Sequence, residues 1–541
     1  MSSAFKFHSQ VQNVVPWPAQ YQFPTQSNKV RKQTVKLPPK NGYTFSGSNQ
    51  PIRIEFPADG YCNMLNSILS FNATVTLPAI ATTECNYVTL ERGGGHNFFS
   101  RLRVLYGSLV IEDIQEYKTL VRMINEVAVS KSYGSSSGTL LDGMSAGRIN
   151  DIALDFDNTD GQNTQTNANP ADYLPPGYMN FASIYSNVDT TSLATLGAGL
   201  QRIVAQLGTI VETSDAVGMN MMGGRVFGHA AGSPVFVQTG AKTFTKTFAL
   251  NLLSGLLTSK KLIPLKWMAS QLVIELTIAD PSVVFMTNIA PTPTFTLTNV
   301  NFIAEMLEFD STYDLAFFQG LSQDAGVPIK FTSWHYHQFS INSGTATYQV
   351  HERSRSVKNA FAVIRNSAPT AITDSSIFFH NLNDDISNST VSRPSLCAVG
   401  SYQWRIGGQY YPAQPVSCTY QAAEAYTELM KAIDALGDYT VSSNITNRNF
   451  SVTYTTEGNG EGAKFIMAGS FENPTTGGQL EVNGINAEEQ SDLALTFSCT
   501  NNAGSIGSFA NTTTAGKKLE VFVNYDTMLI IRKGNVVDLI L

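Results

Sequence analysis

The sequence has few charged residues and no cysteine motif. Lysine, arginine, aspartate and glutamate make up 14% of its 541 residues, against about 25% in an average soluble protein. Serine, threonine, asparagine, glutamine and glycine take their place, which predicts that much of the surface faces other protein. The five cysteines are widely spaced and include no C-x-x-C pair. This pattern argues against zinc and redox sites and favours assembly in a reducing, intracellular environment.

Long apolar runs are also missing. No stretch approaches the ~18 apolar residues that a membrane-spanning helix requires. The first eight residues, Met-Ser-Ser-Ala-Phe-Lys-Phe-His, lack the apolar segment of a signal peptide. We therefore expect neither a membrane span nor export.

The length predicts two domains of roughly 250 residues each, because a single hydrophobic core stops growing below this size. Residues 1–45 are rich in proline, glutamine and asparagine and show no helical or strand periodicity. Residues 1–50 hold six cations and no aspartate or glutamate. We predict an extended basic arm over residues 1–45, whose contacts come from Lys29, Arg31, Lys32, Lys36 and Lys40.

Strand signals dominate from residue 51 onward, since the apolar residues alternate with polar ones or are β-branched. Two helices are predicted, over 113–129 and 420–436, where apolar residues recur at spacings of three and four. Residues 130–240 are rich in serine, glycine, asparagine and threonine with weak periodicity. They predict long loops on a rigid β framework.

The order of predicted elements recurs in the two halves. A strand at 101–106 precedes the helix at 113–129, and strands follow at 246–250, 271–278 and 294–303. In the second half a strand at 401–406 precedes the helix at 420–436, and strands follow at 464–468, 493–499 and 519–526. Residue identity between the halves is slight. Two tandem β units are the simplest account, each a sandwich, jelly roll or barrel that buries its apolar faces.

Four segments resemble the double jelly-roll major capsid proteins of polinton-like viruses, virophages and their larger relatives, the lineage that includes adenovirus hexon. They are 98–107 (FFSRLRVLYG) with the helix that follows, 253–257 (LSGLL) running into 261–265 (KLIPL), 327–334 (VPIKFTSW) and 355–365 (RSVKNAFAVIR). The resemblance covers about residues 45–541 and lies in the order and texture of the segments.

The resemblance implies an all-β fold, a double jelly roll of two tandem eight-stranded β-sandwiches with short helices and long loops. The first roll would span 46–308, including the loops at 130–240, and the second 309–541. It also implies homotrimers that form pseudo-hexagonal capsomers. The function would be that of a structural major capsid protein, which self-assembles inside the infected host cell into the icosahedral shell of a DNA virus and remains in the virion.

The partners implied by the resemblance are other copies of the chain in the trimer and in neighbouring capsomers, together with penton and minor capsid proteins. The basic arm would tie capsomers together, touch an internal membrane or meet packaged DNA. Its cations lack interleaved aromatic residues, which suits tethering better than sequence reading.

Two patterns resemble catalytic or metal sites. His335-Tyr-His337 places two imidazoles on one face of a strand, as cupin metal sites do. However, Glu352 follows fifteen residues after His337, too far for that pattern, so packed or solvent-facing histidines are expected. Ser136 lies in a formal G-x-S-x-G motif, but no strand precedes it and no helix follows, so we expect a Ser/Gly turn.

Three further patterns have simpler explanations. Gly93-Gly-Gly-His-Asn lacks the Gly-Lys-Ser or Gly-Lys-Thr of a phosphate loop and predicts a tight turn. Residues 155–161 are rich in aspartate but out of step with a calcium loop. Arg353, Arg355 and Lys358 suit a solvated rim or intersubunit ion pairs better than a phosphate site. We expect no enzyme activity, catalytic residue, metal or cofactor.

Two alternative functions stay open. The chain could be a minor capsid or vertex protein of the same virion. It could also be a jelly-roll carbohydrate-binding protein or glycosidase, which would need paired carboxylates and exposed aromatic platforms. The sequence has only four tryptophans, so such platforms are scarce.

Overall fold

The computed structural model describes residues 30–78, 86–90, 93–130, 133, 137–143, 227–228, 242–287, 292–321, 326–341, 345–366, 399–418, 423–436, 443, 445, 450, 464–472, 484–488, 493–499, 517–532 and 536–540. Of the predicted loops at 130–240, the described elements are the short helix α4 (Ser137–Leu141) and β8 (Phe227–Gly228). Apart from residues 130, 133, 142 and 143, the rest of those loops lies outside the described residues.

The first half of the chain forms two antiparallel sheets. One has the order β1 (Val30–Leu37), β12 (Thr294–Phe309), β4 (Tyr61–Leu77) and β9 (Lys242–Leu250), with β2 (Thr44–Phe45) beside β12. The other has the order β3 (Pro51–Glu55), β10 (Leu272–Ile278), β6 (Phe99–Tyr106) and β7 (Leu109–Gln115). A small third sheet joins β11 (Phe285–Thr287), β5 (Asn86–Leu90) and β8.

The second half also forms two antiparallel sheets. One has the order β13 (Val327–Ile341), β20 (Lys517–Arg532), β15 (Val357–Asn366) and β18 (Met467–Ser470), with β21 (Val536–Ile540) beside β20. The other has the order β14 (Thr345–Val350), β19 (Leu493–Cys499), β16 (Val399–Ile406) and β17 (Gln409–Ser417).

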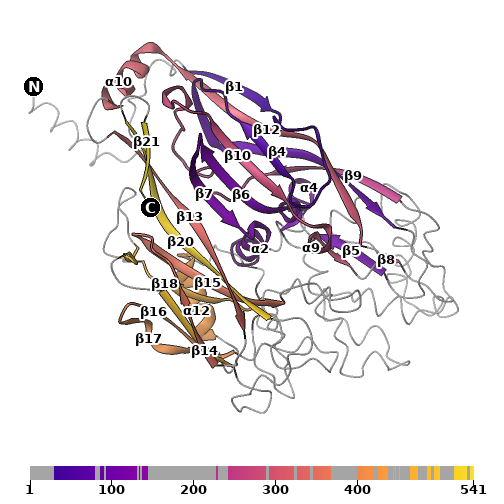
Figure 1. Cartoon of the computed structure of the whole chain (residues 1–541), viewed down its shortest axis with the longest axis vertical. Helices are drawn as coiled ribbons and strands as arrows, with labels where there is room; N and C mark the ends of the chain where they lie inside the picture. Colours follow the sequence, from indigo (N-terminus) through magenta and orange to yellow (C-terminus); the bar gives the residue numbers. More distant parts are fainter. Residues whose placement is uncertain are drawn as a thin grey trace, which may run out of the picture.

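The two halves share one strand order. When the eight main strands of each half are numbered along the chain, both halves give sheets of order 1-8-3-6 and 2-7-4-5. A helix follows the fifth strand in each, α2 (Tyr117–Ala128) after β7 and α12 (Ala423–Ala432) after β17. Two antiparallel sheets connected in this way form a jelly roll. The predicted all-β double jelly roll is confirmed, and we call the halves the first and second roll (Figure 1).

Large apolar side chains fill the space between the two sheets of each roll. In the first roll Phe71 of β4 meets Phe99 of β6 edge to face, with ring centroids 5.6 Å apart. In the second roll Trp404 of β16 is fully buried and covers Gly469 of β18, where a β-carbon would lie 2.6 Å from the indole. Burial of both inner faces follows from the alternation of the strands, as in β3, where Ile52 and Ile54 are buried.

The N-terminal boundary of the first roll lies earlier than we predicted. Residues 30–37 form strand β1, which pairs with β12 along its whole length, and residues 44–45 form β2. The prediction of an arm over residues 1–45 is therefore wrong for residues 30–37 and 44–45, which are strands of the first roll. The sequence did not predict β1, because an edge strand with exposed polar side chains shows no regular alternation of apolar and polar residues.

The start of the first helix also differs. We predicted it at residue 113, but β7 extends to Gln115, and Glu116 turns the chain in the left-handed region at φ 46° before α2 begins. Asp113 faces Arg103 across the sheet, and its carboxylate accepts a 2.6 Å hydrogen bond from Nε of Arg101. The second helix, predicted at 420–436, is α12.

A third helix of more than two turns was not predicted. Helix α10 (Ser311–Leu321) connects β12 of the first roll to β13 of the second and lies at one end of the molecule (Figure 1). Among the described residues, further short helices are α9 (Pro281–Val284), η2 (Gly94–Phe98) and η6 (Leu265–Trp267). Within the described residues, none of the helices combines the length and apolar character needed to cross a membrane.

Candidate functional site

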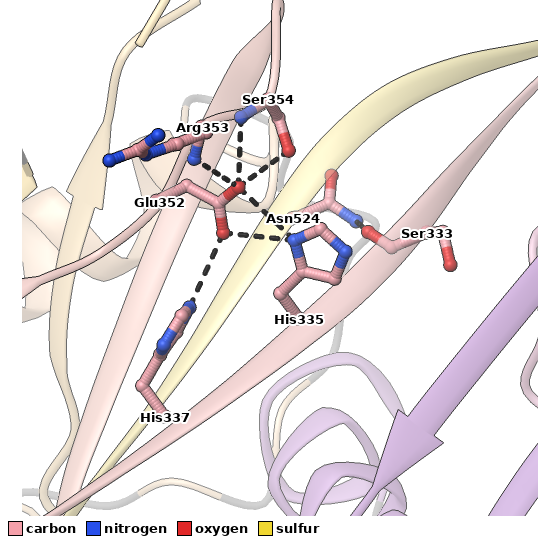
Figure 2. A network of polar contacts seen from close by, with 7 residues as sticks. All are labelled: Ser333, His335, His337, Glu352, Arg353, Ser354 and Asn524. Atoms are coloured by element: carbon pink, nitrogen blue, oxygen red, sulfur yellow. Dashed lines mark hydrogen bonds and ion pairs between the residues drawn. The ribbon is translucent and has the colours of Figure 1, made fainter. Parts of the chain in front are cut away.

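The two histidines of β13 share one carboxylate. His335 and His337 point to the same side of the strand, and Glu352 lies two residues beyond the end of β14 (Figure 2). The Glu352 carboxylate lies 3.0 Å from Nδ1 of His335 and 3.4 Å from Nε2 of His337. The sequence separation that argued against a shared site therefore misled us. Glu352 lies on the connection from β14 to β15, which crosses from one sheet of the roll back to the sheet that contains β13.

Glu352 is held as an anion by its own chain. The residue is 2% exposed, and its Oε1 accepts hydrogen bonds from the backbone amides of Arg353 and Ser354, both 3.0 Å, and from the Ser354 hydroxyl. Burial raises the pKa of Glu352, but the hydrogen bonds from the two histidines and Ser354 outweigh it, so the pKa is well below its usual range.

This arrangement suits a structural clamp better than a metal centre. His335 and His337 side chains are partly exposed, at 38% and 22%, while the carboxylate between them already accepts several hydrogen bonds. In the part of the chain that the structure describes, no group of three or more histidine, cysteine, aspartate or glutamate side chains is arranged so that it could hold a metal ion. The two histidines, which we expected to be packed or solvent-facing, are partly exposed and share a partner, Glu352, that the spacing did not suggest.

A second polar group lies in the first roll, at the turn that contacts the second roll. Glu112 of β7 is buried and accepts hydrogen bonds from the hydroxyl of Ser254 and from the backbone amides of Gly255 (2.9 Å) and Leu256 (3.1 Å). Burial raises the pKa of Glu112 despite these donors. The carboxylate thus fixes the turn at 253–257, one of the segments that carried the family resemblance.

The turn at 253–257 contacts the second roll directly. A β-carbon on Gly255 would lie 1.6 Å from the backbone oxygen of Thr332 in β13. No real β-carbon approaches an oxygen so closely, so the two backbones can meet here only because residue 255 is glycine. The first roll therefore packs on β13 at a fixed distance.

Helix α2 extends this junction with buried charges. Glu126 of α2 pairs with Lys464, which precedes β18 of the second roll, at 3.2 Å, with side chains 0% and 1% exposed. Thr119 of α2 accepts a hydrogen bond from Arg365 of β15. Figure 1 shows α2 between the two rolls.

Arg365 belongs to a buried group around Glu520 of β20. Glu520 is contacted by Arg365 at 3.1 Å, by Lys518 at 2.7 Å and by the hydroxyl of Tyr336 at 2.9 Å. Burial raises the pKa of Glu520, but the opposite charges of Arg365 and Lys518 lower it by more than burial raises it. The pKa is therefore below its usual value. Charges buried in this way need their partners, so Glu520 holds Arg365 in place within the second roll while Arg365 donates to Thr119 of the first.

The remaining candidates from the sequence do not form a site among the described residues. Gly94–Phe98 forms the buried helix η2, and Nδ1 of His96 lies 3.0 Å from the Tyr117 hydroxyl. Arg355 pairs with Glu488 and Lys358 with Glu472, both at 2.8 Å, so these are ion pairs within the chain, and Arg353 is exposed. Ser136 and residues 155–161 lie outside the described residues.

The predicted arm contacts divide into two groups. Lys29 lies outside the described residues, whereas Arg31 and Lys32 are part of β1 and pair with Glu308 (3.6 Å) and Glu305 (2.5 Å) of β12. Lys36 and Lys40 are exposed. Arg31 and Lys32 therefore bind a neighbouring strand of their own roll, which is a different role from tethering.

Comparison with known proteins gives similarity in structure but not in sequence. No protein-family model and no curated protein matches the chain. The Faustovirus major capsid protein has a similar structure, with a TM-score of 0.52 at 9% identity over 96% of this chain and 94% of that one. Weaker similarities include the mavirus major capsid protein (TM-score 0.46, 9% identity, 97% and 94% covered) and PBCV-1 VP54 (TM-score 0.47, 8% identity, 96% and 98% covered). At such low identity, the Faustovirus comparison supports the fold alone.

Proposed function

We propose that this chain is the major capsid protein of an icosahedral DNA virus, a structural protein of the virion with no enzymatic activity. The observation that carries the proposal is the strand order 1-8-3-6 and 2-7-4-5 occurring twice in one chain. The fold that results extends over nearly the full length of the Faustovirus major capsid protein.

Two similar rolls in one chain make a trimer into a six-sided unit. Cyclic trimers are an ordinary closed symmetry, and three copies present six rolls of the same strand order around one axis. Such a pseudo-hexagonal capsomer tiles a flat lattice with a single kind of chain. Its partners are other copies of the chain first, then the penton and minor capsid proteins that close a shell.

The buried acids support a structural role. Within the described residues, Glu112, Glu126, Glu352 and Glu520 are bound by hydroxyls, backbone amides, histidines or cations of their own chain. A glycosidase needs two carboxyl groups free to meet a sugar. The four glutamates instead fix the interior and the junction, as a shell subunit requires.

Measuring mass and shape tests the proposal. The protein, expressed without other viral proteins, should have a mass of three times 58.8 kDa by light scattering and a hexagonal outline in negative stain. A stable monomer at micromolar concentration would overturn the trimer. In particles purified from infected cells the chain should dominate the protein mass, whereas a few copies per particle would make it a minor or vertex protein.

A further inference from the structure

One sheet of the second roll is buried on both faces. Val523 of β20 faces the interior of that roll, because it is in register with Gly469 of β18, which Trp404 of the opposite sheet covers. Phe522 and Glu520 therefore point to the outer face of the sheet β13–β20–β15–β18. Both are fully buried, so another part of the molecule covers this outer face.

The cover is the first roll, through the helix that follows its fifth strand. Thr119 of α2 accepts a hydrogen bond from Arg365 of β15, which also pairs with Glu520 on the outer face. Nine of the twelve residues of α2 are buried, and they include the charged residues Lys118 and Arg122. Helix α2 is therefore buried on its polar side as well as on its apolar side.

The equivalent face of the first roll remains accessible. The sheet β1–β12–β4–β9 has the same order, 1-8-3-6, and Figure 1 shows β12, β4 and β9 on the side of the first roll away from β13 and β20. Phe71 of β4 faces the interior, where it meets Phe99 of the opposite sheet, so Asn72 and Thr74 point outward. Nine exposed or partly exposed residues form three rows across this outer face, which we call the threonine face: Thr294, Thr76 and Thr243; Thr296, Thr74 and Thr245; Thr298, Asn72 and Thr247.

The composition of the threonine face suits burial against protein. None of its nine residues is charged, and neighbouring side chains bind one another, as the hydroxyls of Thr74 and Thr245 do at 2.8 Å. The outer face of the other sheet of this roll differs, since Arg103 there pairs with Glu275 at 2.9 Å. The cores of protein interfaces are depleted of charged residues. The threonine face therefore loses less on leaving water than the ion-paired face does.

The second roll has a helix with an accessible side. Helix α12 follows the fifth strand of its roll, as α2 does in the first. Four of its ten residues are buried, and these are alanine, leucine and methionine, whereas Glu424 and Lys431 are exposed. Within one chain, the helix of the first roll thus covers the outer face of the second, while the helix of the second roll and the outer face of the first are both left accessible.

We propose that the threonine face binds the second roll of another copy of this chain, on the side that carries α12 and β17. The contact continues, from copy to copy, the interface that the two rolls form within one chain. It joins two different surfaces, and such a heterologous contact generates a ring when its rotation closes. Three copies supply the six rolls of that ring. The inference rests on the trimer of the proposed function and names the surfaces that hold it together.

A carboxylate on the threonine face tests the contact. Thr245 is exposed, so Thr245→Glu should leave the chain folded, which circular dichroism checks. In the trimer the new charge would be buried at three equivalent interfaces, so the concentration at which half of the trimers dissociate should rise at least about tenfold.

Thr347→Glu is the matched control. Thr347 is an exposed threonine of β14 whose hydroxyl lies 2.8 Å from that of Thr496 on the neighbouring strand. Strand β14 is the equivalent of β3, whose Arg53 is exposed beside the junction of the rolls. This variant should therefore dissociate at the same concentration as the unmodified protein.

Analytical ultracentrifugation over a concentration series gives the three midpoints. Equal midpoints for Thr245→Glu and Thr347→Glu would overturn the assignment of the threonine face and leave the trimer standing. An unmodified protein that is monomeric would overturn the trimer itself, so the failure of this inference and the failure of the proposed function are distinguishable.

Photo-crosslinking tests the other side of the contact. Lys431 of α12 is replaced by p-benzoylphenylalanine, and irradiation should give a product with the mass of two chains on a denaturing gel. Mass spectrometry should find the probe joined to β12, β4 or β9. Adding Thr245→Glu to the same chain should lower the yield of this product, and adding Thr347→Glu should not. Attachment to other segments, or within one chain alone, would refute the proposed contact.

Discussion

Removing the lysine of the Glu126–Lys464 pair should destabilise the protein severely. Both side chains are almost fully buried and 3.2 Å apart, so Lys464→Met leaves the Glu126 carboxylate in the interior without the ammonium group of this pair. Breaking a buried pair in this way costs about 3–5 kcal/mol. That is a large part of the ~5–15 kcal/mol by which folded domains are stable.

The exposed pair Arg355–Glu488 is the matched control. Its atoms are closer, at 2.8 Å, but its side chains are 60% and 50% exposed. Arg355→Met should therefore change the unfolding free energy by less than about 1 kcal/mol. Burial, rather than distance, decides which pair matters.

A double variant separates the pair from its surroundings. Replacing both partners, as Glu126→Leu with Lys464→Met, removes the isolated charge and should recover much of the loss that Lys464→Met causes alone. The unfolding free energies come from urea denaturation followed by fluorescence, with Trp267 reporting on the first roll and Trp404 on the second. The reasoning fails if Lys464→Met is as stable as Arg355→Met, or if the double variant loses the full sum of the two single changes.

Three further predictions concern the junction, the histidine cluster and the N-terminus. Gly255→Ala should cost at least about 3 kcal/mol of stability, measured by urea denaturation, because its β-carbon would overlap a backbone oxygen of β13. Gly408→Ala, where nothing lies within 4 Å, should be nearly neutral in the same assay. Glu352→Gln should flatten the pH dependence of stability below about pH 5. The pKa of Glu352 is lower in the folded than in the unfolded state, so the unfolded chain binds more protons in this range. The stability that the Glu352 carboxylate contributes at neutral pH is therefore lost on acidification in the unmodified protein. Urea midpoints between pH 7 and pH 3 check this, and parallel slopes for the two proteins would contradict it. Deleting residues 1–45 removes β1 and β2 and should prevent the first roll from folding. Deleting residues 1–28 should leave the strand content seen by circular dichroism unchanged. A well-folded protein that lacks residues 1–45 would show that β1 is dispensable.

Much of the fold could be predicted because strand and helix signals are local. The strands predicted at 401–406, 464–468, 493–499 and 519–526 overlap β16, β18, β19 and β20 of the second roll, and the helix after the fifth strand is amphipathic in both rolls. Strand β1 escaped because its side chains are mostly exposed. Helix α10 escaped for a related reason: its apolar residues do not lie on one buried face, so the periodicity that reveals a helix is missing.

The polar contacts could not be predicted, because each joins residues distant in sequence. Glu352 reaches His335 only once the connection between β14 and β15 is folded, and Glu126 meets a lysine more than three hundred positions away. Nothing in the spacing of Gly255 indicates that it touches β13. The local motif at 253–257 was recognisable, but its role became visible only in the contact between the rolls.

The junction also has a mechanical consequence. Gly255 touches the backbone of β13, and the buried Glu126–Lys464 ion pair between the rolls would be costly to expose. The two rolls therefore have no low-energy way to pivot against each other. A subunit of this kind behaves as a rigid plate. A closed surface tiled with such plates must take up all of its curvature along the seams between them, so its radius is set by how neighbouring edges meet and not by any flexing of the subunit.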